Sequence, residues 1–220
     1  MKTTTESLAS LIDHTLLKPD VTVTQIKKLC HEALEFGFYS VCINPYWIST
    51  AKPLLAGSGV KICTVAGFPL GANLPKSKAH EAAIAFAAGA DEIDMVMNIG
   101  AALENHWNFI EHEIHEVVSV SRQHPVKVVL ETCLLNDEQI REACKATENA
   151  GAAFVKTSTG FGSGGATVEA VQLMRKSVSA ALGVKASGGI RTRDAALKLV
   201  EAGANRLGTS SGIAIVQGAV

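Results

Sequence analysis

The chain has 220 residues, of which 47% are hydrophobic, so it can bury the core of one large domain or two small ones and is not a disordered protein. Its 20 Lys and Arg against 21 Asp and Glu give a formal net charge of -1, which excludes the basic field that holds nucleic acid or an anionic membrane surface. The longest apolar run, 82–90, is far shorter than the roughly 20 residues of a membrane span. We therefore expect a small neutral or anionic ligand, with no nucleic acid and no membrane as partner.

The N-terminus and the cysteines predict a cytoplasmic location. The first residues contain no apolar stretch of signal-peptide length, and Glu6 lies where one would be. An odd number of cysteines without CxxC spacing is typical of a reduced intracellular protein, in which the cysteines are packing residues. They are Cys30, Cys42, Cys63, Cys133 and Cys144.

Helices and strands are predicted to alternate along the chain. Gly37, Gly89, Gly151 and Gly203 each end a helical stretch and are followed at once by a short apolar run. A helix C-terminus favours glycine in a left-handed conformation, and the runs have the length and composition of strands.

Three helices are predicted from apolar residues at positions i, i+3, i+4 and i+7. The third begins at Asn136, a polar cap with Gln139 three residues later. The three faces are Ile26, Leu29, Cys30 and Ala33; Ala79, Ala82, Ala83 and Phe86; and Ile140, Ala143, Cys144 and Thr147.

Eight strands are predicted, and their nearly continuous apolar character is typical of parallel strands buried on both faces. They are 11–15, 39–44, 60–66, 91–97, 126–131, 153–157, 184–187 and 205–207. Eight strand–helix units without a linker indicate the α/β class and a (βα)8 TIM barrel, a compact single domain over residues 1–220. An open doubly wound sheet is the alternative, because alternation alone does not show closure.

The active site of such a barrel lies at the C-terminal ends of the strands, and two lysines lie there inside apolar strands. An ammonium that points inward loses hydration, so burial of Lys156 and Lys185 and their mutual repulsion both favour a free amine. A free amine attacks carbonyl groups, and the pair therefore predicts Schiff-base chemistry. The alternative is that each lysine ends its strand and extends to solvent.

A carboxylate is predicted beside the lysines. Strand alternation places Glu92 and Asp94 on one face, and Asp94, deeper in its strand, is a candidate general acid/base or ammonium partner. The alternative is a salt bridge at the rim of the barrel.

Glycine-rich loops follow three of the predicted strands. Gly160, Gly162 and Gly165 match GxGxxG, but the next strand carries Lys185 where a dinucleotide site needs an acidic residue, which argues against a nicotinamide cofactor. The loops 187–189 and 208–211 occupy the position of the phosphate site of these barrels, where small residues let backbone amides approach the anion. Two ordinary turns are the alternative.

The segment HWNFIEHEIHE imitates a metal site. His112 and His115 do not have HExxH spacing, and with Glu111, Glu113 and Glu116 they are interpreted as the solvated face of a helix. We predict no metal and no other cofactor.

Seven segments give the chain a close resemblance to the deoxyribose-phosphate aldolase family over nearly its whole length. They are IDHTLLKP at 12–19, VCINP at 41–45, TVAGFPLG at 64–71, GADEIDMVMNIG at 89–100, VKTSTGFGSGGAT at 155–167, VKASGGIRT at 184–192 and RLGTSSG at 206–212. The resemblance implies a class I aldolase barrel that reversibly cleaves 2-deoxy-D-ribose 5-phosphate to acetaldehyde and D-glyceraldehyde 3-phosphate, without metal or organic cofactor.

The resemblance also implies roles for individual residues. Lys156 would form the Schiff base, Lys185 would be the second lysine, and Asp94 would shuttle protons. Asp13 and Thr15 would lie near the substrate hydroxyl. Phosphate contacts would come from Gly160, Gly188, Gly189 and Ser210, with Ser211 adjacent.

Two other functions are compatible with the lysine pair and the phosphate loops alone. One is another Schiff-base sugar-phosphate aldolase or a transaldolase-like barrel, and the other is an inactive barrel that binds a sugar phosphate. A homodimer or higher homo-oligomer is compatible with either, since such symmetric assemblies are common.

Overall fold

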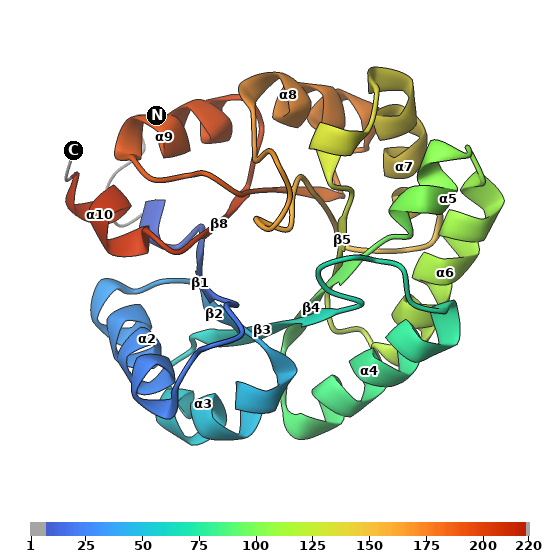
Figure 1. Ribbon diagram of the computed structural model, residues 1–220. Helices are drawn as coiled ribbons and strands as arrows, with labels where there is room; N and C mark the ends of the chain where they lie inside the picture. The colour runs from blue at the N-terminus through green and yellow to red at the C-terminus, as the bar shows by residue number, and fades with distance from the viewer. Residues whose placement is uncertain (1–7, 219–220) are drawn as a thin grey trace.

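The computed structural model describes residues 8–218, and it forms a closed barrel of eight parallel strands surrounded by helices (Figure 1). Each strand pairs with the next along the chain, and β8 closes the barrel on β1. The TIM-barrel prediction is thus confirmed, and the open sheet is excluded by the pairing of β8 with β1. The prediction of a cytoplasmic location used the N-terminal segment, and residues 1–7 of that segment lie outside the described residues.

The strands lie within two residues of their predicted bounds. They are β1 (Ile12–Leu16), β2 (Ser40–Ile43), β3 (Lys61–Ala66), β4 (Glu92–Val96), β5 (Val126–Val129), β6 (Phe154–Lys156), β7 (Gly183–Ser187) and β8 (Arg206–Thr209). The predicted fifth strand extended to Glu131, whose φ of 53° is left-handed and incompatible with a strand.

The helices cover the outside of the strands. They are α2 (Val23–Phe36), α3 (Ile48–Leu55), α4 (Pro75–Ala88), α5 (Ile99–Leu103), α6 (Trp107–Val120), α7 (Asp137–Asn149), α8 (Val168–Ser177), α9 (Arg193–Glu201) and α10 (Gly212–Gln217), with 3₁₀ turns η1 (Pro45–Trp47) and η2 (Thr132–Leu134). Gly37 and Gly89 end α2 and α4 in the predicted left-handed conformation, with φ of 66° and 114°. The cap of α7 is also confirmed, because Gln139 N–H donates to Asn136 Oδ1 at 2.9 Å.

Two helix faces differ from the prediction. The buried face of α4 contains Ala85 and Lys78 together with Ala79 and Ala82, while Ala83 is only partly buried. Lys78 is buried because its ammonium pairs with a carboxylate of α6 at 2.6 Å. The apolar pattern of α4 alone cannot show this partner.

That carboxylate belongs to Glu113, which the sequence pattern placed on the solvated face of its helix. Its side chain is fully buried, and its Oε2 accepts a bond from Asn98 N–H at 2.8 Å. His112 and His115 of the same helix are exposed as expected. A carboxylate between exposed histidines was misplaced because its ion-pair partner lies 35 residues away in the chain.

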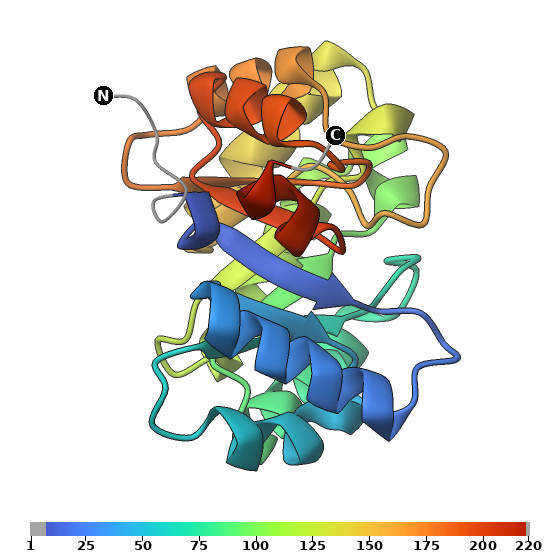
Figure 2. The same ribbon diagram turned by 90° about the vertical axis from the view of Figure 1, so that its left-hand side faces the viewer.

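All strands point the same way, and the loops after β1, β3 and β6 extend beyond their C-terminal ends on the right of Figure 2. The main core lies between strands and helices. A second, small cluster of Leu17, Cys42, Cys63 and Val65 packs with Phe68. Among the described residues, no helix combines the length and hydropathy of a membrane span.

Candidate active site

Three lysines, not two, lie inside neighbouring strands of the barrel. Lys156 on β6 is the register partner of Lys185 on β7, as the sequence argument required. Lys127 on β5 joins them, with a side chain that is fully buried. The sequence VKVV carries the same signal of a lysine within an apolar strand, so the reasoning that found the other two applied equally to Lys127.

Asp94 on β4 is the point at which the three lysines meet. Its Oδ1 accepts a bond from Lys127 Nζ at 2.8 Å, and its Oδ2 accepts bonds from Lys156 and Lys185, each at 2.7 Å. The predicted inward position of this carboxylate is therefore observed, and the rim salt bridge is excluded by its complete burial. Glu92, its neighbour on the same face, forms an ion pair with Lys127, with 2.8 Å between Lys127 Nζ and Glu92 Oε2.

Arg206 on β8 and Asp13 on β1 complete the contacts. The Arg206 guanidinium lies 3.0 Å from both Glu92 Oε2 and Asp13 Oδ1, and the other oxygen of Asp13 is paired with Lys185. The ion pairs thereby close into a ring of alternating charge, which we call the ionic ring. Its members, in order, are Asp94, Lys127, Glu92, Arg206, Asp13 and Lys185.

The ionic ring keeps its groups charged despite burial. Burial would raise the pKa of Asp13, but Lys185, Lys127 and Arg206 hold it at about 2. Burial would likewise raise the pKa of Asp94, which its three lysines hold well below the ordinary range. Burial alone would lower the pKa of Lys127 and of Lys185, but the nearby carboxylates raise both pKa values above the usual lysine value. The ring therefore carries three cations and three carboxylates.

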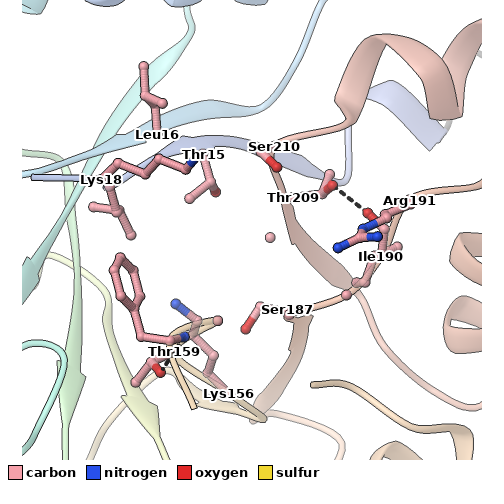
Figure 3. Close-up of a pocket in the computed structure, with 16 residues that line it drawn as sticks. Thr15, Leu16, Lys18, Lys156, Thr159, Ser187, Ile190, Arg191, Thr209 and Ser210 are labelled. Atoms are coloured by element: carbon pink, nitrogen blue, oxygen red, sulfur yellow. Dashed lines mark hydrogen bonds between the residues drawn. The ribbon is translucent and has the colours of Figure 1, made fainter. Parts of the chain in front are cut away.

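A cavity of about 440 Å³ opens at the C-terminal ends of the strands. Figure 3 shows Lys156 and Ser187 on one side of it, with Thr15 and Ser210 opposite and Arg191 at the edge. The lining residues are Thr15, Leu16, Leu17, Lys18, Lys156, Thr159, Gly160, Phe161, Ser187, Gly188, Gly189, Ile190, Arg191, Gly208, Thr209 and Ser210. The lining contains three basic side chains and no carboxylate.

Lys156 connects this cavity to the ionic ring. Its side chain is 3% exposed and lines the cavity, whereas Lys127 and Lys185 are 0% exposed and do not. Among these three lysines, only Lys156 thus meets the cavity directly.

The loop after β7 is shaped for close approach of a ligand to the backbone. Gly188 and Gly189 have φ of 87° and 77°, which other residues rarely adopt. A Cβ at Gly165 would lie 2.3 Å from the Gly188 carbonyl oxygen, so only glycine lets these two loops touch. Thr209 Oγ1 donates to Ile190 O at 2.7 Å and ties the loops after β7 and β8 together.

The loop after β6 is held by Glu131, which follows β5. Glu131 Oε2 accepts bonds from the N–H and the hydroxyl of Thr159, and Thr159 Oγ1 in turn accepts from Phe161 N–H at 3.0 Å. The Phe161 ring meets the Phe68 ring edge-on at 5.3 Å. These contacts fix one wall of the cavity.

All but one of the predicted site residues divide into two groups, and Ser211 lies outside both. Those that line the cavity are Lys156, Thr15, Gly160, Gly188, Gly189 and Ser210. Asp13, Asp94 and Lys185 lie beneath it in the ionic ring, and Ser211 caps α10, with its N–H donating to Thr209 Oγ1 at 2.9 Å.

Sequence reasoning missed three basic residues besides Lys127. Lys18 and Arg191 line the cavity, and Arg206 belongs to the ionic ring. Arg191 follows the Gly188-Gly189 pair, a position that a search for cations near the phosphate loops would have found. Nothing in the short strand around Arg206 marks its side chain as inward, because its partners come from distant strands.

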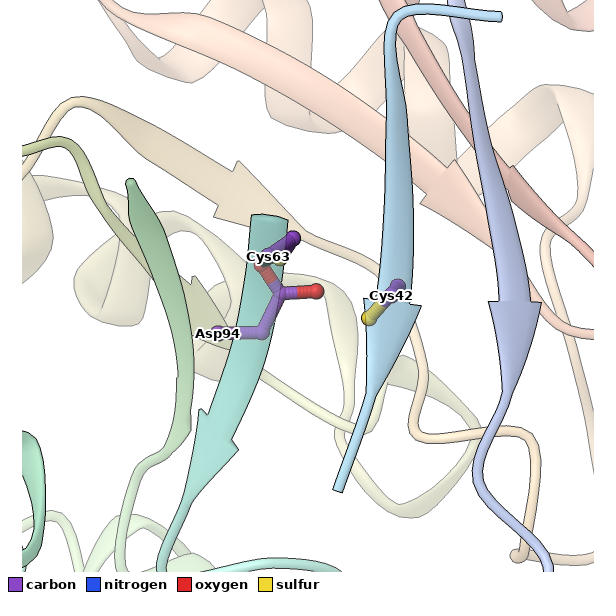
Figure 4. A group of neighbouring side chains, drawn as sticks. All are labelled: Cys42, Cys63 and Asp94. Atoms are coloured by element: carbon purple, nitrogen blue, oxygen red, sulfur yellow. Dashed lines mark hydrogen bonds between the residues drawn. The ribbon is translucent and has the colours of Figure 1, made fainter. Parts of the chain in front are cut away.

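A group of possible metal donors lies beside the ring (Figure 4). The donor atoms of Cys42, Cys63 and Asp94 lie within 4.8 Å of one another. The Lys127 ammonium already lies 3.2 Å from Cys63 Sγ and 2.8 Å from Asp94 Oδ1, so a divalent cation would have to displace it. This donor set therefore fits an ammonium better than a metal ion, and the prediction of no metal is kept.

Comparison with known proteins gives a consistent result. Residues 7–218 match the family described as DeoC/LacD family aldolase. The chain is 53% identical over 213 residues to deoxyribose-phosphate aldolase from a Geobacillus species, and the alignment covers 96% of each chain. It is 55% identical over 208 residues to deoxyribose-phosphate aldolase from Brevibacillus brevis, and that alignment covers 94% of each chain. The tetrameric deoxyribose phosphate aldolase structure from Aeropyrum pernix superposes with a TM-score of 0.91 at 34% identity, covering 97% of this chain and 91% of that one.

Proposed function

We propose that this chain, which belongs to the DeoC/LacD family of aldolases, reversibly cleaves 2-deoxy-D-ribose 5-phosphate to acetaldehyde and D-glyceraldehyde 3-phosphate. The observation that carries the proposal is the position of Lys156. It is an interior lysine that reaches a cavity while it touches a buried carboxylate. A class I aldolase needs this combination of an amine for the carbonyl group and an adjacent proton carrier.

Lys156 is the proposed nucleophile, and the cavity supports this choice over Lys185. The Lys185 ammonium is enclosed between Asp13 and Asp94, and these carboxylates raise its pKa. An amine that stays protonated and does not reach the cavity cannot attack a sugar aldehyde. The family resemblance leads to the same assignment independently.

The reaction proceeds through an imine. The Lys156 amine adds to C1 of the open-chain sugar, and loss of water from the carbinolamine gives the protonated imine. Removal of the C3 hydroxyl proton breaks the C2–C3 bond, which releases glyceraldehyde 3-phosphate and leaves the two-carbon enamine on Lys156. Protonation at C2 and hydrolysis then release acetaldehyde and restore the amine.

Asp94 is the proposed proton carrier for these steps. Its Oδ2 lies 2.7 Å from Lys156 Nζ, which is within direct transfer distance of the group that gains and loses protons. Lys185 holds the same oxygen atom, so it orients the carboxylate and supplies positive charge opposite the developing enamine. In this proposal Lys185 acts through Asp94 rather than on the substrate.

The phosphate is proposed to bind where the loops after β7 and β8 meet. Gly188, Gly189 and Ser210 offer backbone amides and a hydroxyl, and Gly160 borders the same space. Arg191 adds a positive charge that the sequence proposal did not include. Thr15 lines the cavity as well, and we propose that it contacts a substrate hydroxyl.

We also propose a homo-oligomer, because the Aeropyrum pernix relative is tetrameric. Size-exclusion chromatography with light scattering would measure the assembly. A monomer at micromolar concentration would reject this part of the proposal.

Borohydride trapping tests the function and the nucleophile together. Wild type reduced in the presence of deoxyribose 5-phosphate should gain the two-carbon adduct on Lys156, located by peptide mass analysis. Lys156→Ala should lose both cleavage and adduct, while Lys185→Met, as the matched control, should keep an adduct site at Lys156. An adduct on Lys185 would reverse the assignment, and cleavage of a ketose phosphate in preference to deoxyribose 5-phosphate would reject the substrate.

A further inference from the structure

The ionic ring contains equal numbers of positive and negative groups, and Lys156 is bound to it from outside. Four interior cations face three carboxylates among the described residues, so a protonated Lys156 leaves one positive charge without a counter-charge in a buried cluster. An excess charge away from water is unfavourable. Loss of the Lys156 proton removes it and leaves the cluster neutral.

We propose that the ionic ring sets the pH at which the Lys156 amine reacts, through Glu92, Lys127 and Arg206, none of which lines the cavity. This inference rests on the proposed function, because it concerns the amine that forms the imine. The three residues are positioning residues, which act through Asp94 and through charge balance and do not touch the substrate.

Geometry gives the ring a short path to Lys156. Lys127 and Lys156 hold the two oxygens of the same Asp94 carboxylate, at 2.8 and 2.7 Å. Glu92 is the other partner of Lys127, at 2.8 Å, and Arg206 bridges Glu92 to Asp13. An opposite charge within a few ångströms shifts the pKa of a titratable group by about one to three units.

Other polar groups also face this cluster. A hydrogen bond with Cys63 lowers the pKa of the Cys42 thiol against the effect of burial, and Lys185 and Lys156 act in the same direction. Tyr39 O–H donates to Glu92 Oε1 at 3.2 Å, and Ser40 O–H donates to Asp13 Oδ1 at 2.7 Å. Cys63 lies 3.2 Å from Asp94 Oδ1, and burial raises its pKa, so it stays a thiol. The polar or titratable groups on the strands of the barrel are Asp13, His14, Thr15, Ser40, Cys42, Lys61, Cys63, Thr64, Glu92, Asp94, Lys127, Lys156, Lys185, Ser187, Arg206 and Thr209, with Tyr39 directly before β2.

The proposal predicts opposite effects for two substitutions. Lys127→Met removes a ring cation, so a protonated Lys156 then balances the cluster and the amine reacts only at higher pH. Glu92→Gln removes a carboxylate, so the excess charge doubles and the amine reacts at lower pH. Each shift should be about one pH unit, and the double variant Glu92→Gln/Lys127→Met should return close to wild type.

Reductive trapping measures this without deoxyribose 5-phosphate. Each protein is treated with acetaldehyde and cyanoborohydride from pH 5 to 10, and ethylation of the Lys156 peptide is quantified by mass spectrometry against an exposed lysine peptide. The readout is the pH of half-maximal labelling. Tyr39→Phe is the matched control, because it removes a bond to Glu92 without changing charge, and it should leave this pH unchanged.

Shifts in the same direction, or no shift in either single variant, would overturn the proposal, since a general loss of packing cannot give opposite shifts that cancel in the double variant. Near-UV circular dichroism checks that each variant folds. If one does not, Arg206→Gln replaces Lys127→Met and Asp13→Asn replaces Glu92→Gln, with the same predicted directions. If the opposite shifts are found but wild type fails to cleave deoxyribose 5-phosphate, the proposed role of the ionic ring is supported and only the proposed substrate is rejected.

Discussion

Three lysines on adjacent strands differ in their access to the cavity. Lys127 and Lys185 are completely enclosed by carboxylates, whereas Lys156 has 3% of its side chain exposed and lines the cavity. The residue type and the strand context are the same in all three. The proposed difference between a nucleophile and a structural cation therefore depends on access to the cavity and not on the type of residue.

Ser210 allows the phosphate proposal to be tested at a single residue. Ser210→Asp should lower kcat/KM for deoxyribose 5-phosphate by about 100-fold or more, because a fixed carboxylate competes for the same amides and repels the phosphate. Unphosphorylated deoxyribose should lose much less. The measurement is kcat/KM for both sugars, with Ser210→Asn as the uncharged control, and an equal loss for both sugars would place the phosphate elsewhere.

Helices α4 and α6 are joined to the active-site end of the barrel by the buried Lys78–Glu113 pair. The Lys78 ammonium also donates to Gly71 O at 2.6 Å and to Val96 O at 2.8 Å, at the loop after β3 and the end of β4. Burial lowers the pKa of Lys78 and raises that of Glu113, so both shifts oppose the ion pair. The pair therefore fixes the arrangement of these elements more than it adds net stability.

A double-mutant cycle would measure this coupling. Lys78→Met leaves Glu113 buried without a counter-charge and should lower the free energy of unfolding by about 3–5 kcal/mol. Lys78→Met/Glu113→Leu should be less destabilised than Lys78→Met alone. Urea unfolding provides the values, and additive effects of the two single substitutions would show that the pair is not coupled.

The barrel as a whole has an unusual interior for its fold. TIM barrels fill the space inside their strands mainly with Val, Ile and Leu layers, whereas here much of it is occupied by the ionic ring. Its carboxylates must be ionised for the cations to stay paired. The stability of the molecule should therefore depend on pH in the acid range.

Asp13 sets the direction of this pH dependence. Its pKa falls from 3.8 to about 2 on folding, so it contributes stability that is fully present above about pH 4 and is lost as the pH falls toward 2. The contribution of this one group is about 2 kcal/mol. Unfolding free energies measured by urea at pH 5, 4, 3 and 2 should decline less steeply in Asp13→Asn than in wild type, and parallel curves would contradict the assignment.

Local patterns determined the elements of this protein. The repeated glycines, the apolar faces of α2 and α7, and eight apolar runs were enough for the α/β class and the barrel, because each depends on residues close together in the chain. The same strand logic placed Lys156, Lys185 and Asp94 at one end of the barrel. Family resemblance, and not pattern, supplied the substrate.

Tertiary structure alone decided which charges are partners. Lys78 and Glu113 are 35 residues apart, Lys185 and Asp94 are 91 apart, and Arg206 and Asp13 are 193 apart. A charged residue that pairs across such distances looks like a surface residue in its own segment, as Glu113 did. The energy of a buried charge depends on its neighbours in space, and barrel closure, which brings β8 against β1, is what creates those neighbours.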